Sequence, residues 1–231
     1  MTKTYRGYTL EQVAKTIDHS ILKPDFTYAD VEAGAQLALK FNTASYCIRP
    51  MDVEAAAKAL AGSTVNVCTV IGFPHGSTTS AVKAFETADA IKNGATEIDM
   101  VINVSALLSG DYDFVEQDIR GVVEVAHAAG ASVKVIFETA FLNDELIVKA
   151  CELTERAGAD YVKTSTGFAS EGATLHNVKL MKATVGDRLK VKSSGGVRTL
   201  DQLIDYMDAG VTRSGCSATQ QVLEEFIAKA Q

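Results

Sequence analysis

The sequence predicts a single (β/α)8 TIM barrel with a short N-terminal helix, in which residues 1–231 form one domain. Three observations predict this fold: short β-branched runs alternate with segments of helical periodicity, one helix–glycine–strand junction recurs, and the alternating units number eight. Strands that alternate with helices imply a parallel sheet. Eight units in 231 residues match the closed barrel better than an open doubly wound sheet, which is the alternative if a terminal strand fails to form.

Eight short runs with strand-like composition are expected to form the barrel wall. They are, in chain order, TIDHSI (16–21), TASYCI (43–48), VNVCTVIG (65–72), TEIDMVIN (96–103), SVKVIFET (132–139), DYVKTS (160–165), LKVKSS (189–194) and VTRSG (211–215). The first and the last of these runs are the weakest strand assignments.

Helical periodicity fills the intervals between these strands, as in residues 80–94, 113–130 and 143–159. A glycine ends several of the intervals just before the next strand, which is where glycine commonly terminates a helix. These residues are Gly94, Gly130, Gly158 and Gly210. Because no linker, low-complexity tract or shift in composition interrupts the pattern, one domain is favoured.

The acidic balance of the chain argues against two classes of partner. There are 29 acidic and 22 basic residues, a net charge of −7, whereas nucleic acids and anionic membranes attract basic surfaces. No apolar run approaches the ~18 residues of a membrane span, and the polar N-terminus has no signal-peptide core, so a cytoplasmic protein is expected. The four cysteines lack CxxC spacing and are expected to be reduced, and no motif points to a metal or another cofactor.

Charged side chains occur toward the C-terminal ends of several predicted strands, where barrel enzymes place their catalytic groups. They are Asp18, Asp99, Glu138, Lys163 and Lys192. Taken alone, a charged residue at a strand end is more often solvated or salt-bridged than catalytic. The combination is more informative than any single member.

Lys163 and Lys192 end adjacent strands, which lie ~4.8 Å apart in a sheet. A free lysine has a pKa near ~10.4, but a neighbouring cation and partial desolvation favour its neutral form. A neutral amine at this position suits a nucleophile that forms a Schiff base with a carbonyl substrate, with Asp99 carrying protons directly or through a water. The alternative is a structural Lys–Asp ion pair, and Lys134 is interpreted as a structural charge inside the barrel.

Two loops rich in glycine and serine follow the last two predicted strands, where barrels frequently hold phosphate. In SSGGVRT (193–199), Gly195 and Gly196 would let backbone N–H groups approach an anion. In SGCSAT (214–219), Ser217 could add a hydroxyl donor. One such loop is a weak signal because turns use these residues constantly, but two in the expected places predict a phosphate site.

Six motifs, which span essentially the whole chain, carry a family resemblance. They are IDHSILKP (17–24), CTVIGFPHG (68–76), SAVKAFETADAIKNGATEIDMVINVSAL (80–107), VKTSTGF (162–168), KSSGGVRT (192–199) and GVTRSGCS (210–217). With them the chain resembles the deoxyribose-phosphate aldolases. The resemblance implies a class I aldolase without a metal or other cofactor, which cleaves 2-deoxy-D-ribose 5-phosphate reversibly to acetaldehyde and D-glyceraldehyde 3-phosphate. It also implies that the partners are these small substrates and that the assembly is a homodimer.

The same resemblance implies roles for individual residues. Lys163 matches the family's Schiff-base lysine, Asp99 the aspartate of its proton relay, and Lys192 the second lysine that assists the first. Asp18 matches a polar residue near the substrate hydroxyls. Contacts to the phosphate or to the adjoining part of the substrate are implied for Thr166, Gly167, Gly195, Gly196, Gly215 and Ser217.

The chain departs from the family pattern at four positions. Ala218 follows Ser217 where the family usually has two serines, so one phosphate donor is missing. Cys216 stands where alanine or threonine is more common. Ala140 replaces a usual cysteine, and Ser20 replaces a usual threonine.

Other functions remain open from the sequence. Ala218 keeps open a related class I aldolase with a different or non-phosphorylated acceptor. A catalytically silent barrel that binds sugar phosphates is a second alternative, and an isomerase with Glu138 as its base is a third, which rests on fold analogy. Cys47, at the end of the second strand, either faces the active site and reacts with aldehydes or is an inert core thiol.

Overall fold

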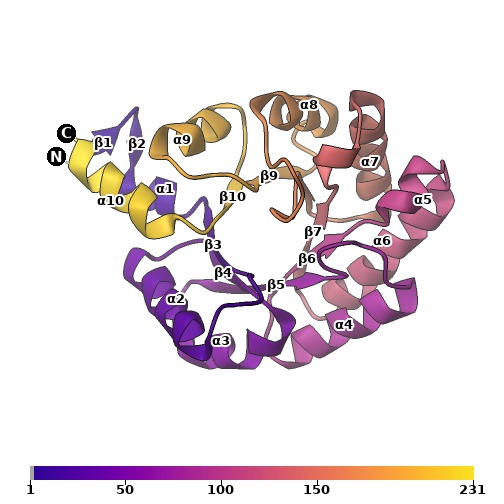
Figure 1. The fold of residues 1–231 in the computed structure, drawn as a ribbon, viewed down its shortest axis with the longest axis horizontal. Helices are drawn as coiled ribbons and strands as arrows, with labels where there is room; N and C mark the ends of the chain where they lie inside the picture. Colours follow the sequence, from indigo (N-terminus) through magenta and orange to yellow (C-terminus); the bar gives the residue numbers. More distant parts are fainter. Residues whose placement is uncertain (1–2) are drawn as a thin grey trace.

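The computed structural model describes residues 3–231, and its central feature is a closed barrel of eight parallel strands (Figure 1). Strands pair in chain order, and β10 pairs with both β9 and β3, so the barrel has no free edge. The strands are β3 (Ile17–Ile21), β4 (Ser45–Ile48), β5 (Asn66–Ile71), β6 (Glu97–Val101), β7 (Ser132–Ile136), β8 (Tyr161–Lys163), β9 (Lys190–Ser194) and β10 (Arg213–Cys216). Closure confirms the predicted TIM barrel, including its two weakest strands.

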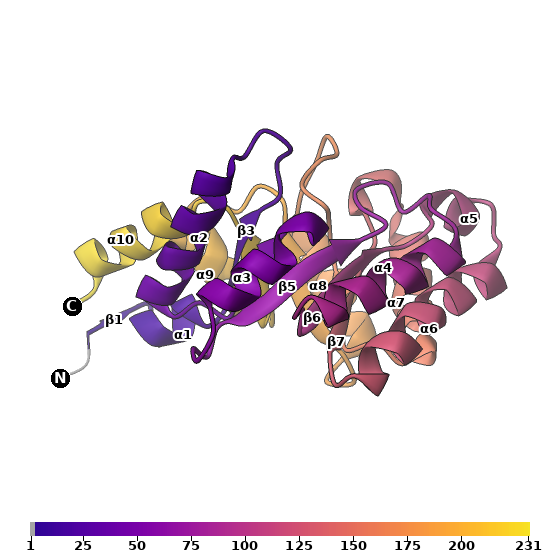
Figure 2. The same ribbon diagram turned by 90° about the horizontal axis from the view of Figure 1, so that it is seen from below.

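Helices form an outer layer around the strands (Figures 1 and 2). The main ones are α2 (Tyr28–Phe41), α3 (Val53–Ala59), α4 (Ser80–Lys92), α6 (Tyr112–Ala128), α7 (Asp144–Ala157), α8 (Leu175–Val185), α9 (Leu200–Asp208) and α10 (Thr219–Lys229). Shorter pieces are α5 (Val104–Leu108) and the 3-10 helices η1 (Pro50–Asp52) and η2 (Thr139–Phe141). The helical intervals expected from the sequence are therefore confirmed.

The N-terminal segment begins with a small antiparallel hairpin of β1 (Thr4–Tyr5) and β2 (Tyr8–Thr9), which the sequence pattern did not indicate because its strands are too short to show alternation. The expected short helix follows as α1 (Leu10–Ala14). Thr4 and Gln231 exchange two backbone hydrogen bonds of 3.0 and 3.2 Å, which join the two ends of the chain (Figure 1). Residues 1 and 2 of the predicted domain lie outside the described residues.

Local signals account for where the helices begin and end. The hydroxyls of Thr27, Thr79 and Thr199 each accept a hydrogen bond from the backbone N–H three residues later, which satisfies one of the free donors of a helix N-terminus. The four glycines expected after helices all have positive φ, which fits helix-ending turns that residues with a Cβ adopt at a cost. They are Gly94, Gly130, Gly158 and Gly210, with φ of 108°, 76°, 84° and 96°.

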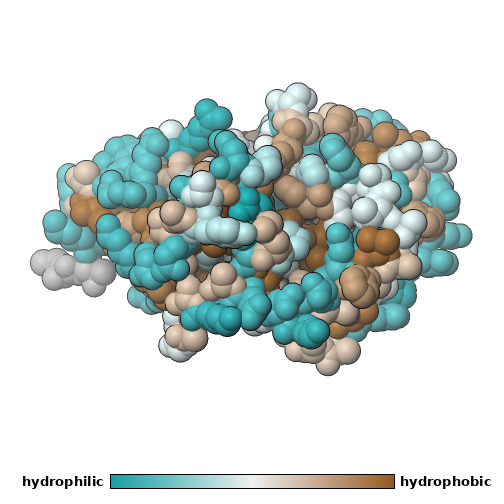
Figure 3. All heavy atoms as spheres, turned by 60° about the horizontal axis from the view of Figure 1, so that its bottom comes forward, coloured by the Kyte–Doolittle hydropathy of each residue, from teal (hydrophilic) through white to brown (hydrophobic). Residues whose placement is uncertain are grey.

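No helix in the described part of the chain is both long and apolar enough to cross a bilayer. On the face drawn in Figure 3, hydrophobic residues lie in small groups among hydrophilic ones. Single exposed apolar side chains of this kind are common on protein surfaces.

His19 is a buried base inside the wall of the barrel. Its ring stacks on Tyr46 with centroids 5.7 Å apart, and its Nδ1 lies 2.9 Å from the Oγ1 of Thr219. The Thr219 hydroxyl donates to the Cys216 carbonyl at 3.1 Å, so Nδ1 carries the proton that His19 donates to Thr219. Burial lowers the pKa of His19 to about 4, and the imidazole is therefore neutral at physiological pH.

We expect this histidine to make the stability of the fold depend on pH. In the unfolded chain its pKa is near ~6.5, so between that pH and about 4 the unfolded state binds a proton that the folded state does not. The free energy of unfolding should therefore fall as the pH drops, by about 2 kcal/mol between pH 7 and pH 5. Urea unfolding of the wild type and of His19→Gln at both pH values measures this, and an equal pH dependence in the two proteins would contradict it.

Candidate active site

A cavity of about 680 Å³ opens at the end of the barrel to which the C-termini of the strands point. It is lined by residues from five of the strand ends and from loops that follow them. The lining residues are Ser20, Leu22, Lys23, Pro24, Asp25, Phe26, Cys47, Lys163, Thr166, Gly167, Phe168, Lys192, Ser194, Gly195, Gly196, Val197, Arg198, Gly215 and Ser217. This is the end at which barrel enzymes carry out chemistry.

Lys163 and Lys192 meet at the floor of this cavity, on neighbouring strands and in register. Both ammonium nitrogens donate to the same oxygen, the Oδ2 of Asp99, at 2.7 Å from Lys163 and 2.6 Å from Lys192. Lys163 is 3% exposed and Asp99 is fully buried. The three residues that the sequence singled out for chemistry are thus in direct contact.

A chain of ion pairs continues from Asp99 down the inside of the barrel. Lys134 donates to the other oxygen of Asp99 at 2.9 Å and to Glu97 at 2.6 Å. Arg213 bridges Glu97 and Asp18 at 2.5 and 2.6 Å. Asp18 in turn contacts the Lys192 ammonium, so the pairs form one connected network.

The network holds more basic groups than carboxylates. Its carboxylates are those of Asp18, Glu97 and Asp99. Its basic groups are those of Lys134, Lys163, Lys192 and Arg213. Among the described residues Lys163 pairs with one carboxylate and each of the other three cations pairs with two. With every group ionised, the four basic groups and three carboxylates leave one excess positive charge, which the loss of one proton would remove.

The network sets the charge states of its members. Burial by itself would raise the pKa of Asp99, but Lys134, Lys163 and Lys192 hold it well below its usual value. Burial works against the ammonium form of Lys192, but Asp18 and Asp99 raise the pKa of Lys192 above its usual value. Asp99 is therefore a carboxylate and Lys192 a cation across the pH range in which enzymes work.

Asp18 lies below the cavity rather than in its wall. Its carboxylate is fully buried, pairs with Arg213 and Lys192, and forms no part of the cavity wall. Ser20, two residues further along the same strand, does line the cavity. Since alternate residues of a strand share one face, Asp18 points into the barrel one layer below Ser20.

The residues expected around a phosphate all line the cavity, and they are Thr166, Gly167, Gly195, Gly196, Gly215 and Ser217. Gly195 has a φ of +81°, and a Cβ there would lie 2.9 Å from the Cα of Gly172 and 3.3 Å from that of Gly167. Only glycine allows the loops after β8 and β9 to approach so closely. This packing places their backbone at one side of the cavity.

The start of α10 completes this side of the cavity. Ser217 lines the cavity, and the helix begins two residues later, at Thr219. Its N-cap, Ala218, makes no side-chain hydrogen bond to the first turn. The first backbone N–H groups of the helix, with its positive dipole end, are thus free of a side-chain cap and suit an anion.

Two cationic residues of the cavity were missed at the sequence level. Lys23 and Arg198 line the same cavity as the glycine loops. Both belong to motifs quoted above, ILKP and GGVRT, but neither stands at a strand end, which is the position that indicates a catalytic charge in a barrel. Their charge complements a phosphate group.

Glu138 and Cys47 have different surroundings. Glu138 accepts hydrogen bonds from the hydroxyl and backbone N–H of Thr166, and it lies outside the lining of the cavity that holds Lys163. This placement gives no support to an isomerase that uses Glu138 as base in that cavity. Cys47 lines the cavity, so of the two alternatives it faces the active site, while its reactivity toward aldehydes stays a prediction.

Comparisons with known proteins agree with this geometry. A model of the family described as DeoC/LacD family aldolase matches residues 12–218. The chain is similar to the deoxyribose-phosphate aldolase of Staphylococcus haemolyticus, with 56% identity over 211 residues that cover 91% of this chain and 95% of that protein. The corresponding protein of Clostridium perfringens is 53% identical over 214 residues, 93% of this chain and 95% of that one.

The fold is likewise similar to that of solved structures. The tetrameric deoxyribose phosphate aldolase from Aeropyrum pernix superposes with a TM-score of 0.89 at 31% sequence identity. The match covers 95% of this chain and 93% of that one.

Proposed function

The chain belongs to the DeoC/LacD family of aldolases, and on that basis we propose that it is a deoxyribose-phosphate aldolase. It cleaves 2-deoxy-D-ribose 5-phosphate reversibly to acetaldehyde and D-glyceraldehyde 3-phosphate, a carbon–carbon lyase reaction. The observation that carries this proposal is Lys163 at the floor of the cavity, hydrogen-bonded to a carboxylate that also holds Lys192.

Lys163 acts as the nucleophile. The excess of one basic group in the network supports an amine among its members, and Lys163 has the fewest carboxylate partners among the described residues. The amine attacks C1 of the open-chain sugar, and loss of water gives an iminium ion. A base removes the proton of the C3 hydroxyl, and the electron pair of the C2–C3 bond moves to the iminium. The bond breaks, which leaves an enamine on Lys163 and free glyceraldehyde 3-phosphate with its new aldehyde at the former C3.

Asp99 acts as the proton acceptor for this step, and Lys192 provides a fixed positive charge beside it. Asp99 contacts the Lys163 nitrogen and can accept its proton, while Lys192 supplies a fixed cation that contacts the same Asp99 oxygen. Protonation of the enamine and attack of water on the resulting iminium release acetaldehyde and restore the amine. Asp18, through Arg213 and Lys192, is a positioning residue for this pair.

Covalent trapping tests the proposal most directly. Acetaldehyde and sodium borohydride should leave one ethyl group on the chain, because hydride reduces the iminium to a stable secondary amine. Peptide mapping should place this group on Lys163. Modification of a different lysine, or none in folded protein, would overturn the assignment.

The phosphate of the substrate binds between the glycine loops, the start of α10 and the two cationic side chains. We expect Arg198→Ala to raise KM for 2-deoxyribose 5-phosphate about 10- to 100-fold, because a hydrogen bond to a charged group contributes about 1.5–3 kcal/mol. KM for unphosphorylated deoxyribose should change little. Arg188→Ala, which removes an exposed arginine paired with Glu155 outside the cavity, is the matched control. An equal effect on both sugars would contradict the phosphate contact.

A related aldolase with a non-phosphorylated acceptor is the second candidate, because Ala218 leaves the first turn of α10 without a side-chain cap. If a phosphate binds there, Ala218→Ser adds a donor and should lower KM for the phosphorylated sugar about 3- to 10-fold. An unchanged KM, with a phosphate preference of only a few-fold in the wild type, favours the second candidate. The added cap should also stabilise the fold by about 1 kcal/mol, so the melting temperature is measured separately.

We also propose that the chain acts as a single domain in the cytoplasm, where its four buried free cysteines stay reduced. A homodimer is the assembly that the family resemblance suggests, although the relative from Aeropyrum pernix is a tetramer. Light scattering on the purified protein distinguishes a dimer from a monomer or a tetramer.

A further inference from the structure

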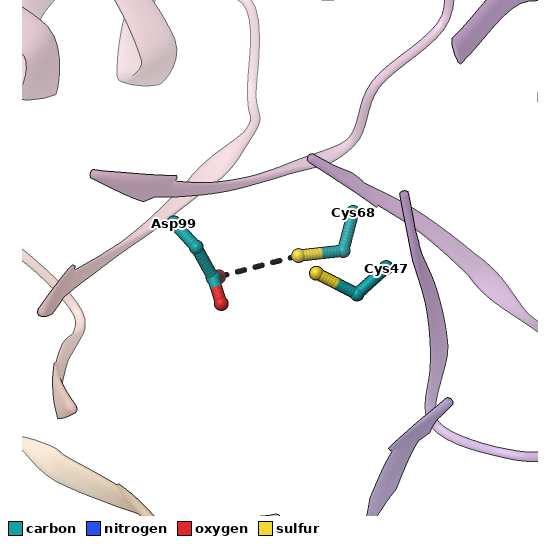
Figure 4. A group of neighbouring side chains, drawn as sticks. All are labelled: Cys47, Cys68 and Asp99. Atoms are coloured by element: carbon teal, nitrogen blue, oxygen red, sulfur yellow. Dashed lines mark hydrogen bonds between the residues drawn. The ribbon is translucent and has the colours of Figure 1, made fainter. Parts of the chain in front are cut away.

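Three potential metal ligands meet beside the nucleophile, and they are Cys47, Cys68 and Asp99 (Figure 4). The two cysteines are in register on the neighbouring strands β4 and β5, and Asp99 lies on β6. One ligand atom from each residue lies within 4.8 Å of those from the other two, and Cys68 Sγ lies 3.2 Å from Asp99 Oδ1. Figure 4 shows the thiols and the carboxylate directed toward one another.

The donor set suits a thiophilic cation. Two sulfurs that each lie ~2.3 Å from a tetrahedral zinc ion are roughly 3.8 Å apart, which the observed spacing of the three atoms accommodates. Two thiolates and one carboxylate would fill three of the four positions around a tetrahedral ion. Cys47 lines the active-site cavity, so an ion can enter from there and keep a fourth, open position toward it.

We propose that Cys47, Cys68 and Asp99 bind one thiophilic divalent cation, Zn²⁺ or Cd²⁺, and that this ion inhibits the enzyme. On binding, each thiol loses its proton to solvent and its sulfur donates an electron pair to the metal. One dication thus replaces two protons, and the net charge of the buried network does not change. Lys134 would not bind the ion but is placed to donate hydrogen bonds to two of its ligands. Its Nζ lies 3.6 Å from Cys68 Sγ and 2.9 Å from Asp99 Oδ1.

Inhibition rests on the proposed function, whereas binding does not. The metal would draw electron density from the carboxylate that accepts hydrogen bonds from Lys163 and Lys192. This loss of electron density weakens the proton acceptor beside Lys163 and so opposes Schiff-base chemistry there.

Cadmium titration tests binding without reference to activity. With the full chain in thiol-free buffer, Cd²⁺ should produce an ultraviolet thiolate-to-metal absorption band that saturates at one ion per chain and disappears with EDTA. Cys68→Ala should lose the band and weaken binding at least tenfold. Cys151→Ala, which removes a buried thiol on α7 outside the cluster, should keep both. An unaltered band in Cys68→Ala, or no band in the wild type, would overturn the site.

A second variant and an activity measurement complete the test. Cys47→Ser removes the other thiol and should weaken binding similarly, which keeps the test decisive if Cys68→Ala does not fold. Zn²⁺ should inhibit the wild-type and Cys151→Ala proteins in parallel with occupancy, and EDTA should reverse the inhibition. Full activity with the site occupied refutes inhibition, whereas absence of aldolase activity in metal-free protein refutes the proposed function instead.

Discussion

Lys163→Met should lower kcat for cleavage of 2-deoxyribose 5-phosphate by at least about 10⁴-fold, because the covalent route is lost with the amine. Methionine has a similar length and no charge, and Asp99 keeps contacts to Lys134 and Lys192. The barrel should therefore stay folded. Acetaldehyde release measures the activity, and circular dichroism reports the fold.

A matched lysine serves as the control for this variant. Lys190 is exposed and lies at the first residue of β9, at the opposite end of the strand from the cavity. Lys190→Met should retain activity within about twofold, because surface substitutions away from special contacts have small effects. If Lys163→Met kept activity within tenfold of the wild type, Lys163 would not be the nucleophile.

Asp99→Asn is expected to damage both stability and catalysis. The amide removes the only carboxylate that Lys163 contacts among the described residues, and it leaves Lys134 and Lys192 with one partner each. Removing one partner from a buried ion pair typically costs 3–5 kcal/mol, so the free energy of unfolding should fall by about that amount. Loss of the proton acceptor should lower kcat by about 10²-fold or more.

Urea unfolding and steady-state kinetics measure the two effects in the same preparation. Asp187→Asn is the control, since Asp187 is fully exposed and pairs with Lys182 at the surface. Its stability should change by less than about 0.5 kcal/mol. An Asp99→Asn protein as stable as the wild type would show that the buried charges do not depend on Asp99.

The active-site lysines could be predicted because their placement depends on local pattern. Lys163 and Lys192 follow apolar strand residues, and neighbouring strands of a parallel barrel end side by side. The glycine loops were predictable for the same reason, since each directly follows a strand. Asp99 was also singled out from the sequence, although its contact with both lysines was not predicted.

Other members of the site could not be predicted in this way. Glu97 and Arg213 are the first residues of β6 and β10, at the opposite end of those strands from the expected catalytic groups. Asp18 was expected near substrate hydroxyls, and the structure places it one layer below the cavity lining. Spacing along the chain predicts neither the participation of Glu97 and Arg213 nor the depth of Asp18, because both depend on which side chains face each other inside the closed barrel.

The sequence by itself determined the barrel and predicted a nucleophile and two anion-binding loops, since strand and helix periodicity and strand-end chemistry are properties of short segments. Only the tertiary structure decided which charges are paired, which lysine has the fewest partners, and which cysteines meet Asp99. The contact between Arg213 and Asp18 joins residues 195 positions apart in the chain. Barrel closure creates such contacts, and the burial that accompanies it makes them strong enough to set the charge states on which the chemistry depends.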